Sequence, residues 1–231
     1  MCRGGPIVAV RHCPRPAPRR HGDGMTERTL YRLAGLAGLI GGALIVLAVA
    51  RRGGVLPETA LTHALAPPAS ALLLLTLTAL YLRQRDRAGR LGLAGFVLNH
   101  LGLSGLFAIE FLTHAVLQYQ DAATRDQLVT GPGRPYFLVV ALTFLAGVLL
   151  FGVASWRAGV LPRGAIVLYV VGLSAAALRT AVPEAVYLGG LLVGSAGVLW
   201  LAQTLIRSST APSAMSLRNW APARRTPSTR A

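Results

Sequence analysis

The chain has 231 residues, of which 53% are apolar and only 13% charged, and its mean hydropathy is +0.54. These values exclude an ordinary soluble domain of this length. The net charge of +15 comes from arginine alone, since the chain has no lysine. Arginine in the loops and tails of a membrane protein accounts for this charge, so we expect the lipid bilayer as a partner and no nucleic acid.

The first 24 residues are rich in Arg, Pro and Gly and contain no apolar run long enough for the core of a signal peptide. We predict a disordered basic tail over residues 1–24. The alternative is an over-extended start, with Met25 as the true first residue. Both cysteines, Cys2 and Cys13, lie in this segment. Disulfides and thiolate metal sites are therefore not expected in the rest of the chain.

Six apolar stretches follow, and charged clusters separate most of them. A bilayer core of about 30 Å needs about 20 helical residues, so each stretch can span it, the fifth only just. The runs are continuous and rich in Leu and Ala, without the alternation of a strand. The sequence thus predicts an all-α transmembrane domain over residues 25–207, with six helices at 30–50, 61–82, 91–118, 136–156, 165–182 and 185–206.

Arginine is concentrated between the second and third stretches, between the fourth and fifth, and in the C-terminal segment. This bias predicts that both termini are cytoplasmic. The absence of lysine and the abundance of Ala, Gly, Leu and Pro are typical of a GC-rich bacterial genome, so we expect a bacterial plasma membrane. Arg51 and Arg52 form a basic pair on the opposite side, where their side chains can snorkel from the helix end. Residues 208–231, rich in Arg, Ser and Pro, are predicted to be a disordered cytoplasmic tail.

Glycines four residues apart occur in the first and the sixth predicted helices. Small residues at this spacing let helix backbones approach closely in lipid. We expect packing within the chain. The alternative is a homo-oligomer through Gly38, Gly42, Gly190 and Gly194.

Two similar hexapeptides, residues 52–57 and 157–162, follow the first and the fourth predicted helices and agree at five of six positions. One interpretation is a 3+3 inverted repeat, the arrangement of many secondary transporters. The other is a generic helix exit, in which Gly ends the helix and Pro prevents its continuation.

The third predicted helix carries four polar residues among apolar neighbours: Asn99, His100, Glu110 and His114. At about 100° per residue they share one arc of about 100°. Placing Arg, Lys or Asp at the centre of a membrane helix costs roughly 2.5–3.5 kcal/mol on insertion scales, and such groups therefore face a partner, a cavity or a pathway. This stripe is the candidate functional site.

Two residues from other helices are predicted to lie near Glu110. His63 stands just before Pro67 and Pro68, which predict a kink. Arg179 lies near the end of the fifth helix, and we expect it to pair with Glu110.

Three functions are consistent with this stripe. The first is a structural or accessory multi-pass protein, in which the polar residues only orient helices. The second is a proton-coupled small-molecule transporter, with Glu110 titrating beside His114, His63 and Asn99. The third is a metal- or haem-binding membrane protein using His63, Glu110 and His114. No paired-His motif recurs, so we expect no cofactor.

Signatures of soluble enzymes are absent from the sequence. There is no Walker loop, no dinucleotide-binding glycine fingerprint and no Gly-x-Ser-x-Gly elbow. The six stretches also contain no Asp. We therefore assign no catalytic residue and do not expect an enzyme.

Residues 31–38, Tyr-Arg-Leu-Ala-Gly-Leu-Ala-Gly, open the first helix, and residues 155–163, Ser-Trp-Arg-Ala-Gly-Val-Leu-Pro-Arg, follow the fourth. With these segments the region 28–206 resembles a broad set of small multi-pass membrane proteins from high-GC bacteria, grouped as domains of unknown function. The resemblance implies a membrane bundle, but no substrate and no catalytic residue.

Overall fold

The computed structural model describes residues 23–179 and 181–210. The predictions for most of the N-terminal segment, including Cys2 and Cys13, and for residues 211–231 lie outside the described residues.

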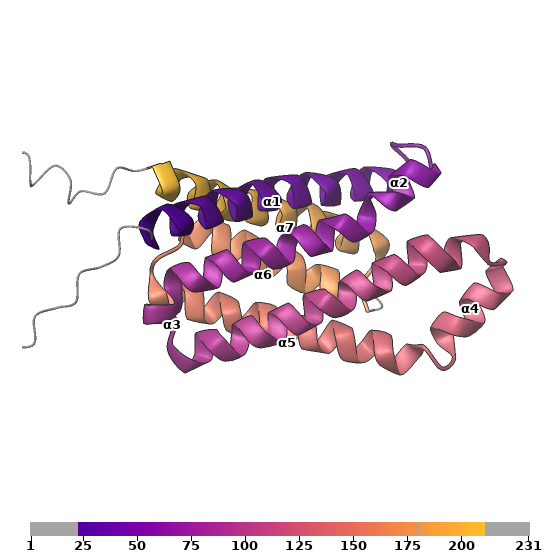
Figure 1. Cartoon of the computed structure of the whole chain (residues 1–231). Coiled ribbons are helices and arrows are strands. Elements are labelled where there is room, and N and C mark those ends of the chain that lie inside the picture. The colour runs from indigo at the N-terminus through magenta and orange to yellow at the C-terminus, as the bar shows by residue number, and fades with distance from the viewer. Residues whose placement is uncertain (1–22, 180, 211–231) are drawn as a thin grey trace, which may run out of the picture.

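The described part of the chain is all-helical and contains no strand, which confirms the predicted fold class. Long helices run along the bundle, and the short helices α2 and α4 lie at one end of it (Figure 1). The elements in chain order are α1 (Asp23–Arg52), α2 (Ala60–Ala64), α3 (Ala66–Phe111), the π-helical turn η1 (Leu112–Val116), the 3₁₀ turn η2 (Leu117–Tyr119), α4 (Ala122–Thr130), α5 (Arg134–Ala158), α6 (Arg163–Ala177) and α7 (Glu184–Thr210).

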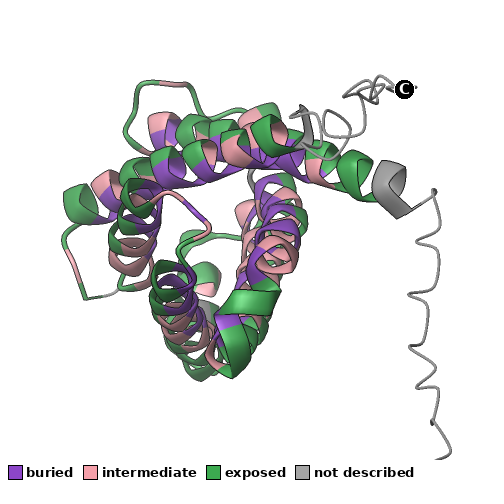
Figure 2. Cartoon of the chain, turned by 90° about the vertical axis from the view of Figure 1, so that its left-hand side faces the viewer, coloured by how far each residue is buried: buried purple, intermediate pink, exposed green. Residues whose placement is uncertain are grey.

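Four of the described helices, α1, the α3 segment, α5 and α7, are long and apolar enough to cross a membrane, and α6 is a shorter apolar helix. Their buried faces turn toward one another, while their outer faces are exposed (Figure 2). Large apolar side chains such as Leu33, Leu75 and Leu142 are exposed on these outer faces. A surface of this composition is compatible with a lipid environment.

Helix α3 is not straight, because Gly89 has non-helical dihedral angles (φ 58°, ψ −159°). A positive φ of this kind suits glycine, which has no Cβ. Two arms, residues 66–88 and 90–111, run back along each other from this turn (Figure 1). The arms correspond to the second and third predicted helices. Helical structure extends beyond the predicted boundaries on both sides of Gly89.

The second arm of α3 packs directly against α5 through glycine. A Cβ added at Gly147 would lie 2.1 Å from the backbone nitrogen of Asn99. Likewise, a Cβ at Gly95 or Gly102 would lie 2.5 Å from the nitrogen of Phe151 or 2.4 Å from the Cα of Phe144. These two backbones are therefore as close as helix packing allows.

The four glycines of the predicted close contacts also face helices of the same chain. Gly38 and Gly42 meet side chains of α7, and Gly190 and Gly194 meet α6. The expected packing within the chain is confirmed, and a homo-oligomer through these glycines would need faces that α6 and α7 already cover.

Several helix boundaries differ from the prediction. Helix α6 ends at Ala177, not at residue 182: Leu178 leaves the helical conformation (φ −87°, ψ 24°) while its N–H still donates to the carbonyl of Ser174. Pro183 further prevents a helix from continuing through residue 182, because its ring restricts the preceding residue to extended conformations. Helix α4 was not predicted, since it is a short polar surface helix without a hydropathy signal. The predicted interruption at Pro67 and Pro68 is present, between α2 and α3.

The two similar hexapeptides share a local structure. Gly54 (φ 74°) and Gly159 (φ 65°) occupy equivalent positions, and both are left-handed, as expected for glycine beyond a helix end. This geometry favours the helix-exit interpretation. The inverted repeat stays a prediction.

Candidate functional site: a polar cluster at the mouth of a cavity

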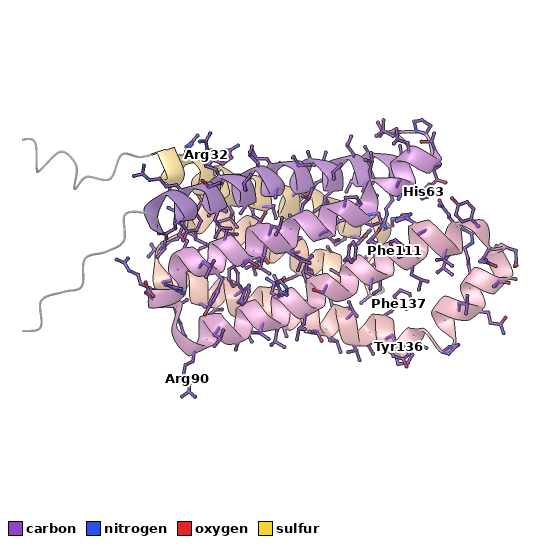
Figure 3. All side chains as sticks on the ribbon, viewed as in Figure 1. Arg32, His63, Arg90, Phe111, Tyr136 and Phe137 are labelled. Carbon is purple, nitrogen blue, oxygen red and sulfur yellow. The ribbon has the colours of Figure 1, made fainter. Side chains whose placement is uncertain are left out.

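Polar side chains from five elements meet at one end of the bundle, which we call the polar end. Figure 3 shows that His63, Phe111 and the start of α5 at Tyr136 lie toward this end, away from Arg32 and Arg90. The polar side chains that meet here come from the last turn of α1, from α2, from the end of α3, from η1 and from the start of α7. These side chains, which we call the polar cluster, are Arg51, Arg52, His63, Glu110, His114 and Tyr187.

Arg52 is the central cation of this cluster. Its Nη2 lies 3.4 Å from Oε1 of Glu110, and its Nη1 donates to the hydroxyl of Tyr187. Its guanidinium also lies over the Tyr187 ring, 5.5 Å from the centroid. The Arg52 and Glu110 side chains are 16% and 23% exposed, so water screens the pair only partly.

A row of close contacts leads from Glu110 to α1. Oε2 of Glu110 lies 3.0 Å from Nε2 of His114, without the alignment of a hydrogen bond. Nδ1 of His114 lies 2.8 Å from Nδ1 of His63, and Nη1 of Arg51 lies 2.8 Å from that same His63 nitrogen. The row thus joins α3, η1, α2 and α1.

Two proton arrangements fit the contacts of His63. Nη1 of Arg51 lies 2.8 Å from Nδ1 and 3.1 Å from Nε2 of His63, and a guanidinium only donates, so either ring nitrogen can be the acceptor. If Nε2 accepts, Nδ1 of His63 donates to Nδ1 of His114; if Nδ1 accepts, the proton between the rings belongs to His114. In both arrangements Nε2 of His114 faces Glu110.

The π turn η1 places His114 in this row. The N–H of Leu117 donates to the carbonyl of Leu112, five residues earlier, which turns the helix by less than 100° per residue. A regular α-helix through residue 118, as predicted, lacks this adjustment. Short π turns of this kind recur at functional sites.

Arg179 does not form the predicted ion pair. Among the described residues, Arg52 and His114 are the basic side chains within 4 Å of the Glu110 carboxylate. Arg179 lies over the other partner of Arg52, the Tyr187 ring, 5.3 Å from its centroid. Arg52 is favoured because the last turn of α1 already faces α3, whereas α6 ends before reaching Glu110.

The polar cluster borders a central cavity of about 880 Å³, lined by both arms of α3 and by α1, α5, α6 and α7. Most lining residues are apolar. Arg52, His63, Glu110 and His114 line it at the polar end, and Asn99 and Tyr169 line it near the middle of their helices. The volume is within the range of sites that bind small molecules.

Asn99 lies in the lining of this cavity and has an unpartnered polar atom. Its side chain is fully buried, and its Nδ2 contacts the Tyr169 hydroxyl, while Oδ1 has no hydrogen-bond partner. An unpaired buried amide group costs about 1–3 kcal/mol. An occupant that carries a hydrogen-bonding group would remove this cost.

His100, the fourth member of the predicted stripe, lies elsewhere. It does not line the cavity, and its ring packs 5.5 Å from Phe96, which stacks on Tyr81 of the first arm at 4.4 Å. The structure thus brings Asn99, Glu110, His114 and His63 to one cavity and leaves His100 between the arms of α3.

The donor set does not fit a metal ion or a haem. Two nitrogens bound to one tetrahedral zinc lie about 3.3 Å apart, farther than the 2.8 Å between the Nδ1 atoms of His63 and His114. Two histidines in direct contact also leave no room for a haem iron between them. Arg51 adds positive charge beside His63. Within the described ranges, no group of three or more His, Cys, Asp or Glu residues is arranged to hold a metal.

Comparison of the chain with protein-family models, with curated proteins and with solved structures found no match in any of the three.

Proposed function

We propose that the chain is a multi-pass protein of the bacterial plasma membrane that binds a small molecule in its central cavity. The proposal includes six membrane crossings, by α1, the two arms of α3, α5, α6 and α7, with both termini in the cytoplasm. Each arm of α3 is about 34 Å long at 1.5 Å per residue, which is enough to cross a bilayer core of about 30 Å.

The observation that carries this proposal is the cavity of about 880 Å³ with an unpartnered, fully buried Asn99 in its lining. A protein with only a structural role gains nothing from such a cavity, because cavities and unpaired polar atoms both lower stability.

Cysteine accessibility tests the proposal, since the two native cysteines can be replaced by serine. Ala141 lines the cavity, while its neighbour Leu142 is 54% exposed on the outer face. In proteoliposomes we expect Ala141→Cys to react with a water-soluble methanethiosulfonate reagent and Leu142→Cys to be protected by lipid. An unreactive Ala141→Cys in correctly folded protein would leave the structural or accessory role as the better account.

A second candidate function is proton-coupled transport of the bound molecule. The row of contacts from Glu110 through His114 to His63, with links of 3.0 and 2.8 Å, favours it, because such a row can pass a proton between side chains. Glu110→Gln is expected to keep binding and to abolish proton flux into proteoliposomes. Equal proton flux in the variant and the wild type would contradict coupling at Glu110.

A further inference from the structure

Most of the charged residues that line the cavity are basic. Its charged lining residues are one carboxylate, Glu110, and four arginines at the polar end: Arg52, Arg125, Arg134 and Arg179. Arg125, Arg134 and Arg179 are exposed at the rim, and Arg52 is partly buried farther in. A basic rim over an apolar interior attracts anions and guides them inward.

We propose that the bound molecule is a single-chain amphipathic carboxylate whose head group binds Arg52 and whose chain occupies the apolar part of the cavity. This inference rests on the proposed function and names its ligand class. It follows from the arginines in the cavity lining together with the apolar lining beyond them.

Arg52 is placed to receive a carboxylate. Its contacts with Glu110 and Tyr187 engage two of the five N–H donors of a guanidinium. The contact with Glu110 is long, at 3.4 Å, so a ligand carboxylate can replace it with a shorter, two-pronged one. Tyr187 holds the guanidinium in place during this exchange.

The apolar depth of the cavity suits an alkyl chain. Beyond the polar end the lining includes Leu73, Leu77, Leu103, Phe144 and Leu173. Asn99 lies eleven residues from Glu110 along the second arm, about 16 Å at 1.5 Å per residue. A chain carrying a hydroxyl group at that depth would meet the unpartnered oxygen of Asn99.

Photo-crosslinking of the full chain in phosphatidylcholine nanodiscs tests this inference, with a diazirine-bearing hexadecanoate as the probe. We expect crosslinks on cavity-lining peptides, competed by hexadecanoate and by 16-hydroxyhexadecanoate but not by hexadecanol. Arg52→Gln should lower the apparent affinity roughly tenfold or more, the effect of losing a hydrogen bond to a charged group. Arg85→Gln, near the Gly89 turn, is the matched control and should leave labelling unchanged.

Glu110→Gln removes the carboxylate that competes for Arg52 and should raise the affinity for hexadecanoate. This variant keeps the test decisive if Arg52→Gln does not fold. Equal competition by hexadecanol, or an unchanged affinity in both variants, would overturn the carboxylate assignment and leave a neutral ligand in the cavity. Absence of cavity crosslinks together with an unreactive Ala141→Cys would instead overturn the proposed function itself.

Discussion

The two ends of the bundle are built from the same apolar helices, but the helices pack closely at one end and border a cavity at the other. Near the Gly89 turn, small residues such as Ala154, Ala165 and Ala202 are at most 2% exposed, and the helices close on one another. At the polar end, arginine, histidine and glutamate side chains border a cavity. We call the Gly89 end the closed end, because its helices pack through small residues; it has a separate, smaller pocket of about 440 Å³ with a polar lining that includes Arg83 and Asp86. The two ends therefore differ in the size and the lining of their cavities.

The polar contacts also differ between the two ends: at one end they join helices directly, and at the other they face the cavity. At the closed end the buried Gln84 donates to Ser155 at 2.8 Å, and Arg83 donates to the carbonyl of Thr204 at 2.8 Å. Each of these contacts joins two helices directly. At the polar end Arg52, Glu110 and His114 contact one another while also facing the cavity, so a ligand can exchange with them.

The largest predicted effect is on the contact that holds α3 against α5. Gly147→Val would drive a side chain into the backbone of Asn99, which lies 2.1 Å from the Cβ position. Overpacking typically costs about 1–3 kcal/mol, and a clash with backbone should reach or exceed the upper value. We expect loss of monodisperse protein in size-exclusion chromatography.

Gly189→Val is the matched control for this substitution. Gly189 has no atom within 4 Å of its Cβ position, so the variant should elute like the wild type. Equal behaviour of the two variants would contradict the close approach of α3 and α5.

The next effect concerns the ion pair at the polar end. Arg52→Gln and Glu110→Gln each leave a partly buried charge without one of its partners, and each should lower the free energy of unfolding by about 1–3 kcal/mol. The double variant should lose less than the sum of the two, as measured by thermal unfolding in detergent. Strict additivity would show that the two side chains do not interact.

A smaller effect is expected from the hydrogen bond at the closed end. Ser155→Ala leaves the buried amide of Gln84 without its acceptor and should cost about 1–2 kcal/mol. Adding Gln84→Met should recover most of this loss, because both polar partners are then gone and Oε1 of Gln84 is already unpartnered. A double variant less stable than Ser155→Ala would contradict this.

The smallest effect is local to α4. Asp121 accepts hydrogen bonds from the hydroxyl and the N–H of Thr124, which hold the pKa of its carboxyl below its ordinary value. The lowered pKa stabilises the helix start at neutral pH, and this stabilisation is lost as the pH falls below about 4. The protection factors of the α4 amides, which correct for the intrinsic pH dependence of hydrogen exchange, should fall at acid pH in the wild type. They should show no such acid-dependent fall in Asp121→Asn.

The sequence predicted much of the fold, because long apolar runs bounded by arginine leave few alternatives to helices. It placed Glu110, His114 and His63 in one site correctly. It failed for α6, whose apolar run continues past the helix end, and for α4, which has no apolar run at all.

The rest of the site depends on contacts between residues far apart in the chain. Arg52 meets Tyr187 across 135 residues, and Asn99 meets Tyr169 across 70. Periodicity within one helix cannot predict such partners. One signal was present, since Arg51 and Arg52 are a basic pair on the side opposite to most arginines. Because side chains that snorkel to the surface also explain this pair, the sequence alone did not predict that the two arginines belong to the polar cluster.

The most direct test compares two cysteine substitutions in α5, one toward the polar end and one toward the closed end. Ala141 lines the cavity, whereas Ala154 is 2% exposed and lies in the closed end. We predict that Ala141→Cys reacts with an anionic methanethiosulfonate faster than with a cationic one, because of the arginine rim, and that Ala154→Cys reacts with neither. Equal reactivity at the two positions, or a preference for the cationic reagent at Ala141→Cys, would contradict an open, anion-attracting cavity at the polar end.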